Sequence, residues 1–147
     1  MVVRIGSVED VHLKDVDVLV VGLFKVSVVL SEETAVLIGE GRVNILSSLK
    51  CILVSTVGPI VVNHAHCVNL LAVGEKQPVA LGFAKAKRVF ARKAYIQRLN
   101  TREAYLGDLC SIDLLEHADR LIFTDPHTYI KRAESIGEIY YAYEITH

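Results

Sequence analysis

The apolar residues of this chain are mostly valine, isoleucine and leucine in short runs, and this feature constrains the fold most. Val16–Val21 is a nearly continuous run, and Val68–Val73 and Val79–Lys85 are equally short and extended in pattern. Runs of this length that are rich in β-branched residues favour strands. A chain of 147 residues is long enough to bury a real core within one domain. We therefore expect a single domain over residues 1–147 in which these runs share one sheet.

Small helices are predicted between the strands. Ser31 precedes two acids and Gly39 follows, which is the pattern of a short helix with an N-cap and a glycine stop. Further helices are predicted at Thr101–Tyr105, at Ser111–Ala118 and from Asp125 to about Ser135, before a final strand at Glu138–Ile145. The chain shows no internal repeat. Many short strands with small inserted helices predict an α+β fold built on a small, mostly antiparallel, partly open β-barrel.

Three parts of the sequence carry a family resemblance. They are the pair Leu71–Gly74 and Pro78–Ala84, the glycine-ended segment Glu33–Leu46, and the C-terminal third from Ala118 to Ile145. Together they resemble PUA-like domains, the barrel fold of PUA RNA-binding modules and ASCH-type domains, and in particular archaeal PUA-like proteins of unknown function. The resemblance implies a barrel and a bias toward RNA or modified bases. The ASCH signature Gly-x-Lys-x-x-Glu-x-Arg has no counterpart here, so no catalytic or ligand-binding residue is carried over.

A basic stretch interrupts an otherwise acidic chain. Residues 76–102 contain no Asp or Glu and hold half of the 16 Lys and Arg residues, with Phe83, Phe90 and Tyr95 among them. Clustered cations with aromatic residues are typical of a surface that binds a polyanion. We therefore predict weak, salt-sensitive RNA binding. The residues predicted to contact RNA phosphates are Lys85, Lys87, Arg88, Arg92 and Lys93.

Three other interpretations of the basic stretch stay open. Its charges could pair with the acidic segment that follows residue 102, which would leave a solvated face. The chain could be an enzyme or a binding protein for a nucleotide or a small anionic metabolite. It could also be a structural homo-oligomer that docks its basic face on the acidic face of another copy.

Other residue patterns assign no chemistry. His64 and His66 share one face of a strand, a spacing that zinc sites use, but the sequence positions no third ligand, so we predict no metal and no cofactor. No phosphate-binding loop is present, and no nucleophile has a base placed beside it, so no catalytic residue is assigned. Three cysteines and no apolar run of about 18 residues indicate a cytoplasmic protein without a membrane segment.

Overall fold

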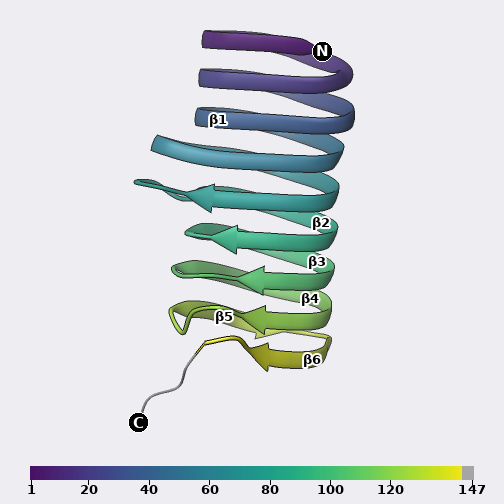
Figure 1. Ribbon diagram of the computed structural model, residues 1–147, viewed down its shortest axis with the longest axis vertical. Helices are drawn as coiled ribbons and strands as arrows, with labels where there is room; N and C mark the ends of the chain where they lie inside the picture. The colour runs from purple at the N-terminus through teal and green to yellow at the C-terminus, as the bar shows by residue number, and fades with distance from the viewer. Residues whose placement is uncertain (144–147) are drawn as a thin grey trace.

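The computed structural model describes residues 1–143 and shows a solenoid of parallel strands (Figure 1). β1 (Val2–Gly74) winds through several successive coils as one extended segment. It is followed by β2 (Val79–Arg92), β3 (Ala94–Leu106), β4 (Cys110–Phe123), β5 (Thr128–Ala133) and β6 (Ile136–Tyr141). The sheet order is β1-β2-β3-β4-β5, and β6 also pairs with β4. Hence β5 and β6 together form the last coil, at the opposite end of the solenoid from the N-terminus.

Residues in register on neighbouring coils are separated by a variable length of chain. Val79 pairs with Ile60 on the preceding coil and with Ala94 on the following coil, and the chain from Ile60 to Val79 is longer than the chain from Val79 to Ala94. The coil from Ile112 to its partner Ile130 is again a longer one. Short loops between the strands absorb these differences, and the loops are joined across coils by backbone hydrogen bonds. The repeat is therefore structural and has no constant period in the sequence.

The core consists of columns of apolar side chains that run along the solenoid. One column contains Val62, Leu81, Ile96 and Ile112, which follow one another in register and are at most 1% exposed. A single coil cannot bury its inward-facing residues by itself. Each coil is covered by the coils above and below, so neighbouring coils stabilise one another.

The predicted strands and the predicted helices had different outcomes. Val16–Val21, Val68–Val73 and Val79–Lys85 all lie in strands of one sheet, as their apolar runs predicted. The predicted helices are wrong, because no helix forms among residues 1–143. The segment from Ser31 to Gly39 lies in β1, Thr101–Tyr105 in β3, Ser111–Ala118 in β4, and the Asp125–Ser135 segment contains β5. Of the predicted final strand Glu138–Ile145, β6 includes residues 138–141, and residues 144–145 lie outside the described part of the chain.

The α+β class and the antiparallel PUA-like barrel are also wrong. Every pairing between strands is parallel, and the sheet does not contain the expected hairpin. In a hairpin, Val73 would lie opposite a residue near Pro78, but its partner is Arg92 at the far end of β2. The loop after Gly74 therefore carries the chain into the next coil instead of turning it back, and the resemblance to PUA-like domains does not extend to the fold.

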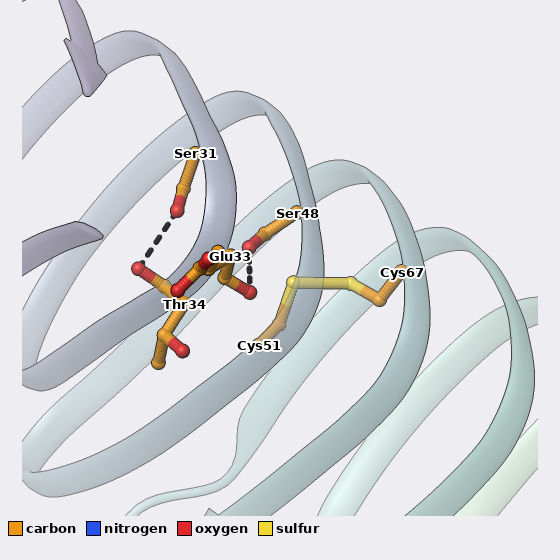
Figure 2. The surroundings of a disulfide bond; sticks show 6 residues. All are labelled: Ser31, Glu33, Thr34, Ser48, Cys51 and Cys67. Atoms are coloured by element: carbon orange, nitrogen blue, oxygen red, sulfur yellow. Dashed lines mark hydrogen bonds between the residues drawn. A yellow bond between two sulfur atoms is a disulfide. The ribbon is translucent and has the colours of Figure 1, made fainter. Parts of the chain in front are cut away.

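A disulfide ties two neighbouring coils at one corner of the solenoid. Ser31, Ser48 and Cys67 follow one another on successive coils there, and Cys67 is bonded to Cys51, with a Cα–Cα distance of 6.3 Å (Figure 2). The hydroxyl of Ser48 donates a hydrogen bond to the carbonyl of Glu33 at 3.0 Å. Ser48 is 7% exposed, so this hydrogen bond satisfies a buried hydroxyl group. The disulfide is at odds with a strongly reducing compartment.

The third cysteine supplies a test of this arrangement. Cys110 is 3% exposed, and burial raises the pKa of its thiol to about 11. Because the thiolate is the reactive form, we expect no thiol to react with Ellman's reagent in the native protein at pH 8 without reductant. After unfolding, one thiol per chain should react, and none in a Cys110→Ser variant. Three reactive thiols in the unfolded, unreduced protein would contradict the disulfide.

Candidate functional site

The structure divides the five cations predicted to bind RNA among different surroundings. Arg88 and Arg92 form ion pairs with acids in the following coil. The Nε atom of Arg88 lies 3.9 Å from Glu103, and that of Arg92 lies 2.5 Å from Asp108. Such exposed pairs contribute about 1 kcal/mol or less each to stability, yet they engage both cations. The acidic segment after residue 102 thus pairs with part of the basic stretch within the same molecule.

Lys93 is held at the loop between β1 and β2. Its φ of 46° places it in the left-handed region, where the chain turns from β2 into β3. Its ammonium group donates hydrogen bonds to the carbonyls of Glu75 at 2.9 Å and Lys76 at 2.8 Å. Lys93 therefore joins two loops of neighbouring coils and does not present a free charge to a ligand.

The aromatic residues of the basic stretch contact other side chains of the protein. Phe90 stacks on Tyr105 with 4.5 Å between the ring centroids, and the guanidinium of Arg98 lies 5.0 Å from the ring centroid of Phe83. The hydroxyl of Tyr95 donates a hydrogen bond to Asp113, and this carboxylate raises the pKa of Tyr95. These contacts weaken the interpretation of the aromatic side chains as stacking faces for bases, and the fold does not support RNA binding.

Lys85 and Lys87 line a groove along the same corner of the solenoid as the disulfide. The groove has a volume of about 690 Å³. Lys85 is in register with His66 and Asn100 on the two neighbouring coils, and Asn100 is in register with His117. One side of the groove is therefore a column of polar side chains, one from each coil. The successive coils are about 4.8 Å apart, as strands in any sheet are.

The other side of the groove is formed by the residues two positions further along each coil. Lys87 follows Lys85 with the buried Ala86 between them, and Arg102 stands in the same relation to Asn100 across the buried Thr101. Two outward-facing residues on either side of this corner can meet, because Nε2 of His117 lies 2.6 Å from Oδ1 of Asp119. The side chains of both columns line one groove.

Three cations dominate the middle of this groove. Lys85, Lys87 and Arg102 are exposed and form no ion pair or side-chain hydrogen bond with any group of residues 1–143. Two acids also line the groove, and one of them, Asp119, is paired with His117. The other, Glu32, lies near Ser31, several coils away from Lys87. The groove therefore combines free positive charge with hydrogen-bonding side chains.

The histidines predicted to share a face are not part of a larger cluster. His66 lines the groove, with its ring centroid 5.7 Å from that of Phe83. Within residues 1–143, no group of three or more His, Cys, Asp or Glu side chains is arranged to hold a metal ion.

A second notable surface is the C-terminal end of the solenoid, where the last residues of the core columns are exposed to solvent. Ile139 of β6 continues the buried column of Leu70, Val89, Ala104 and Leu121. Leu121 is 1% exposed and Ile139 is 47% exposed. Tyr141 stacks on Phe123 and is also exposed. We call the surface formed by β5 and β6 the open end.

The N-terminal end differs from the open end. Inward-facing Val8 and Leu13 of the first coil are 7% and 3% exposed, so the core there is largely covered. Half-exposed Asp10 lies near them and forms an ion pair with Arg4 at 3.6 Å. Charge on a strand edge opposes pairing with another chain. The N-terminal end also exposes Val3, Ile5 and Val11, so the two ends differ mainly in how well their inward-facing residues are covered.

Sequence reasoning predicted Lys85 and Lys87 as site residues but missed one important residue of each surface. Arg102 was counted in the basic stretch but not predicted as a site residue, and Ile139 was treated as part of an ordinary strand. Lys87 and Arg102 are as far apart along the chain as the in-register partners Val79 and Ala94, so they occupy equivalent places on successive coils. A constant coil length would have made this spacing visible, but the length changes from coil to coil.

Comparison with protein-family models, curated proteins and solved structures finds no match to this chain. Residues 1–143 form no helix that is long and apolar enough to cross a membrane.

Proposed function

We propose that this protein is a structural building block that associates with a second copy of itself through the open end. The observation that carries the proposal is the exposure of the core column at Ile139, which is 47% exposed where its partner Leu121 is 1% exposed. A coil in the middle of a solenoid is covered on both sides, and a terminal coil needs a cap or a partner to cover its inward-facing residues.

Burial of the open end offers a substantial driving force. Ile139, Tyr140, Tyr141 and Tyr129 are between 47% and 62% exposed. Complete burial of one large apolar side chain contributes about 1.5 to 3 kcal/mol, so covering several half-exposed ones contributes several kcal/mol before the cost of association. The unpaired backbone edge of β5 and β6 can add hydrogen bonds to a partner strand.

The charges of the open end suit a two-fold arrangement. β5 carries Lys131, which has no ion pair among residues 1–143, and Arg132, which pairs with Glu134 at 3.5 Å, whereas β6 carries Glu138 and no base. A two-fold axis can set β5 of each copy against β6 of the other. Each cationic β5 then lies beside Glu138 of the other copy, and the interface contains this contact two times. An interface of this kind uses the same surface on both copies and closes as a dimer. This differs from the opposite-face docking expected from the sequence, because much of that charge is paired within the chain.

The experiment is sedimentation velocity over a range of protein concentrations. We expect the wild-type protein to form dimers and an Ile139→Glu variant to be monomeric, because a charged side chain would have to lose its water where the apolar core columns of the two copies meet. The matched control is Val57→Glu, which places the same charge at an apolar residue that is 71% exposed and outside β5 and β6. The control should associate like the wild type.

Circular dichroism of each variant verifies that the strands are intact. A wild-type protein that stays monomeric at all concentrations would refute the proposal. Equal association of the wild type and Ile139→Glu would place the interface elsewhere on the molecule.

A further inference from the structure

The groove of Lys85, Lys87 and Arg102 has chemistry that self-association does not use. It lies along a corner of the solenoid and not at the open end, and its lining residues come from successive coils of β1 to β4. Its volume of about 690 Å³ falls in the range of small-molecule sites, which is roughly 300 to 1,000 Å³. A dimer formed through β5 and β6 would leave it accessible.

From the side chains that line this groove, we propose that it binds a small anion with more than one phosphate group. Other cations of the basic stretch are already paired within the protein, unlike those of the groove. Arg88, Arg92 and Arg98 each have a carboxylate within 3.9 Å in the following coil. Lys85, Lys87 and Arg102 have none among residues 1–143, so their charges remain available to a ligand.

The arrangement of these cations selects a compact, multiply charged ligand. Lys85 and Lys87 line the groove from one coil, and Arg102 lines it from the next coil, about 4.8 Å away along the solenoid. Three cations that line one groove on adjacent coils can contact the oxygens of two adjacent phosphates, and arginine can donate two parallel hydrogen bonds to one phosphate. The side chains of Asn100 and His66 border the cations and can donate further hydrogen bonds.

The groove extends over several coils, but its unpaired cations lie on only two of them, and this favours a small ligand over a long polyanion. At the β4 coil, the same two columns are occupied by His117 and Asp119, which bond to each other at 2.6 Å. At the other end, the lining changes to Ser47, Leu49 and Glu32. The positive part is thus limited to the coils that contain Lys85, Lys87 and Arg102, which is about the length of a diphosphate.

The test is isothermal titration calorimetry of the full chain with inorganic pyrophosphate in a chloride buffer of moderate ionic strength. We expect saturable binding of one pyrophosphate per chain and weaker binding of orthophosphate. In a Lys87→Gln, Arg102→Gln variant, the affinity for pyrophosphate should fall about tenfold or more, because each lost charge-assisted hydrogen bond is among the stronger kinds. Adenosine diphosphate, titrated in parallel, tests whether a nucleoside is also accommodated.

The matched control is a Lys25→Gln, Lys50→Gln variant, which removes two exposed cations outside this groove. It should bind pyrophosphate like the wild type. Equal weakening in both double variants would show that only overall charge matters and would overturn the proposal. Absence of wild-type binding would overturn it too, as would affinity that rises steadily with the length of a polyphosphate or RNA chain.

Discussion

Replacement of Gly39 by alanine is expected to destabilise the protein by about 3 kcal/mol or more. Gly39 has a φ of +128°, a conformation that residues with a side chain rarely adopt. A Cβ atom at this position would also overlap the carbonyl oxygen of Gly22 on the preceding coil. Gly22 stands in the same relation to Gly6, so these glycines allow three coils to approach closely at one place. Urea unfolding followed by circular dichroism measures the loss in free energy of unfolding.

Gly6 supplies the control for this prediction. It has a φ of +105°, but a Cβ atom there would have no other atom within 4 Å. Gly6→Ala therefore introduces the backbone strain without the overlap between coils, and it should cost about 1 to 2 kcal/mol. If Gly39→Ala and Gly6→Ala lower the free energy of unfolding by the same amount, the requirement for glycine at position 39 does not come from close contact between coils.

Leu99→Ala is expected to lower the free energy of unfolding by about 2 to 5 kcal/mol. Leu99 is 0% exposed and lies in register between Ala84 and Leu115 in the middle of the core. Ala84 on the preceding coil is too small to fill the space that the leucine side chain leaves, so the substitution creates a cavity between two coils. Because each coil is stabilised mainly by its neighbours, a defect at the centre weakens both halves of the solenoid.

Leu23→Ala is the matched control, since Leu23 is 56% exposed and the same atoms are removed. For a surface position of this kind, we expect the free energy of unfolding to change by no more than about 0.5 kcal/mol. A cost for Leu99→Ala as small as that for Leu23→Ala would contradict the placement of Leu99 in the core.

The wrong helix prediction at Ser111–Ala118 has a specific origin in the burial pattern of β4. The buried residues of β4 include Ile112, Leu115, Ala118 and Leu121, which are spaced three apart. On a straight strand, inward-facing residues are two apart, and spacings of three or four are typical of a helix. A strand that bends around a solenoid corner adds one residue between inward-facing positions. Its pattern therefore imitates a helix, and propensity alone did not distinguish the two.

The candidate sites were predictable only in part. The basic stretch identified Lys85 and Lys87 as chemically notable, and the acidic segment after residue 102 raised the alternative of internal pairing. Which cations are paired depends on register, because Arg88 meets Glu103 only when β2 and β3 lie side by side in parallel. Arg102 joins Lys87 in one groove for the same reason.

The sequence by itself determined that this chain forms strands with a buried core. The run Val16–Val21 is mostly apolar and rich in β-branched residues, and the preference of such runs for strands is local. Only the tertiary structure decided that the strands stack in parallel as coils, that Cys51 bonds to Cys67, and that Ile139 ends an open column. These features depend on which residues lie in register. Here the register is set by corners and loops that change the length of the coil from one turn of the solenoid to the next, so no fixed period in the sequence reveals it.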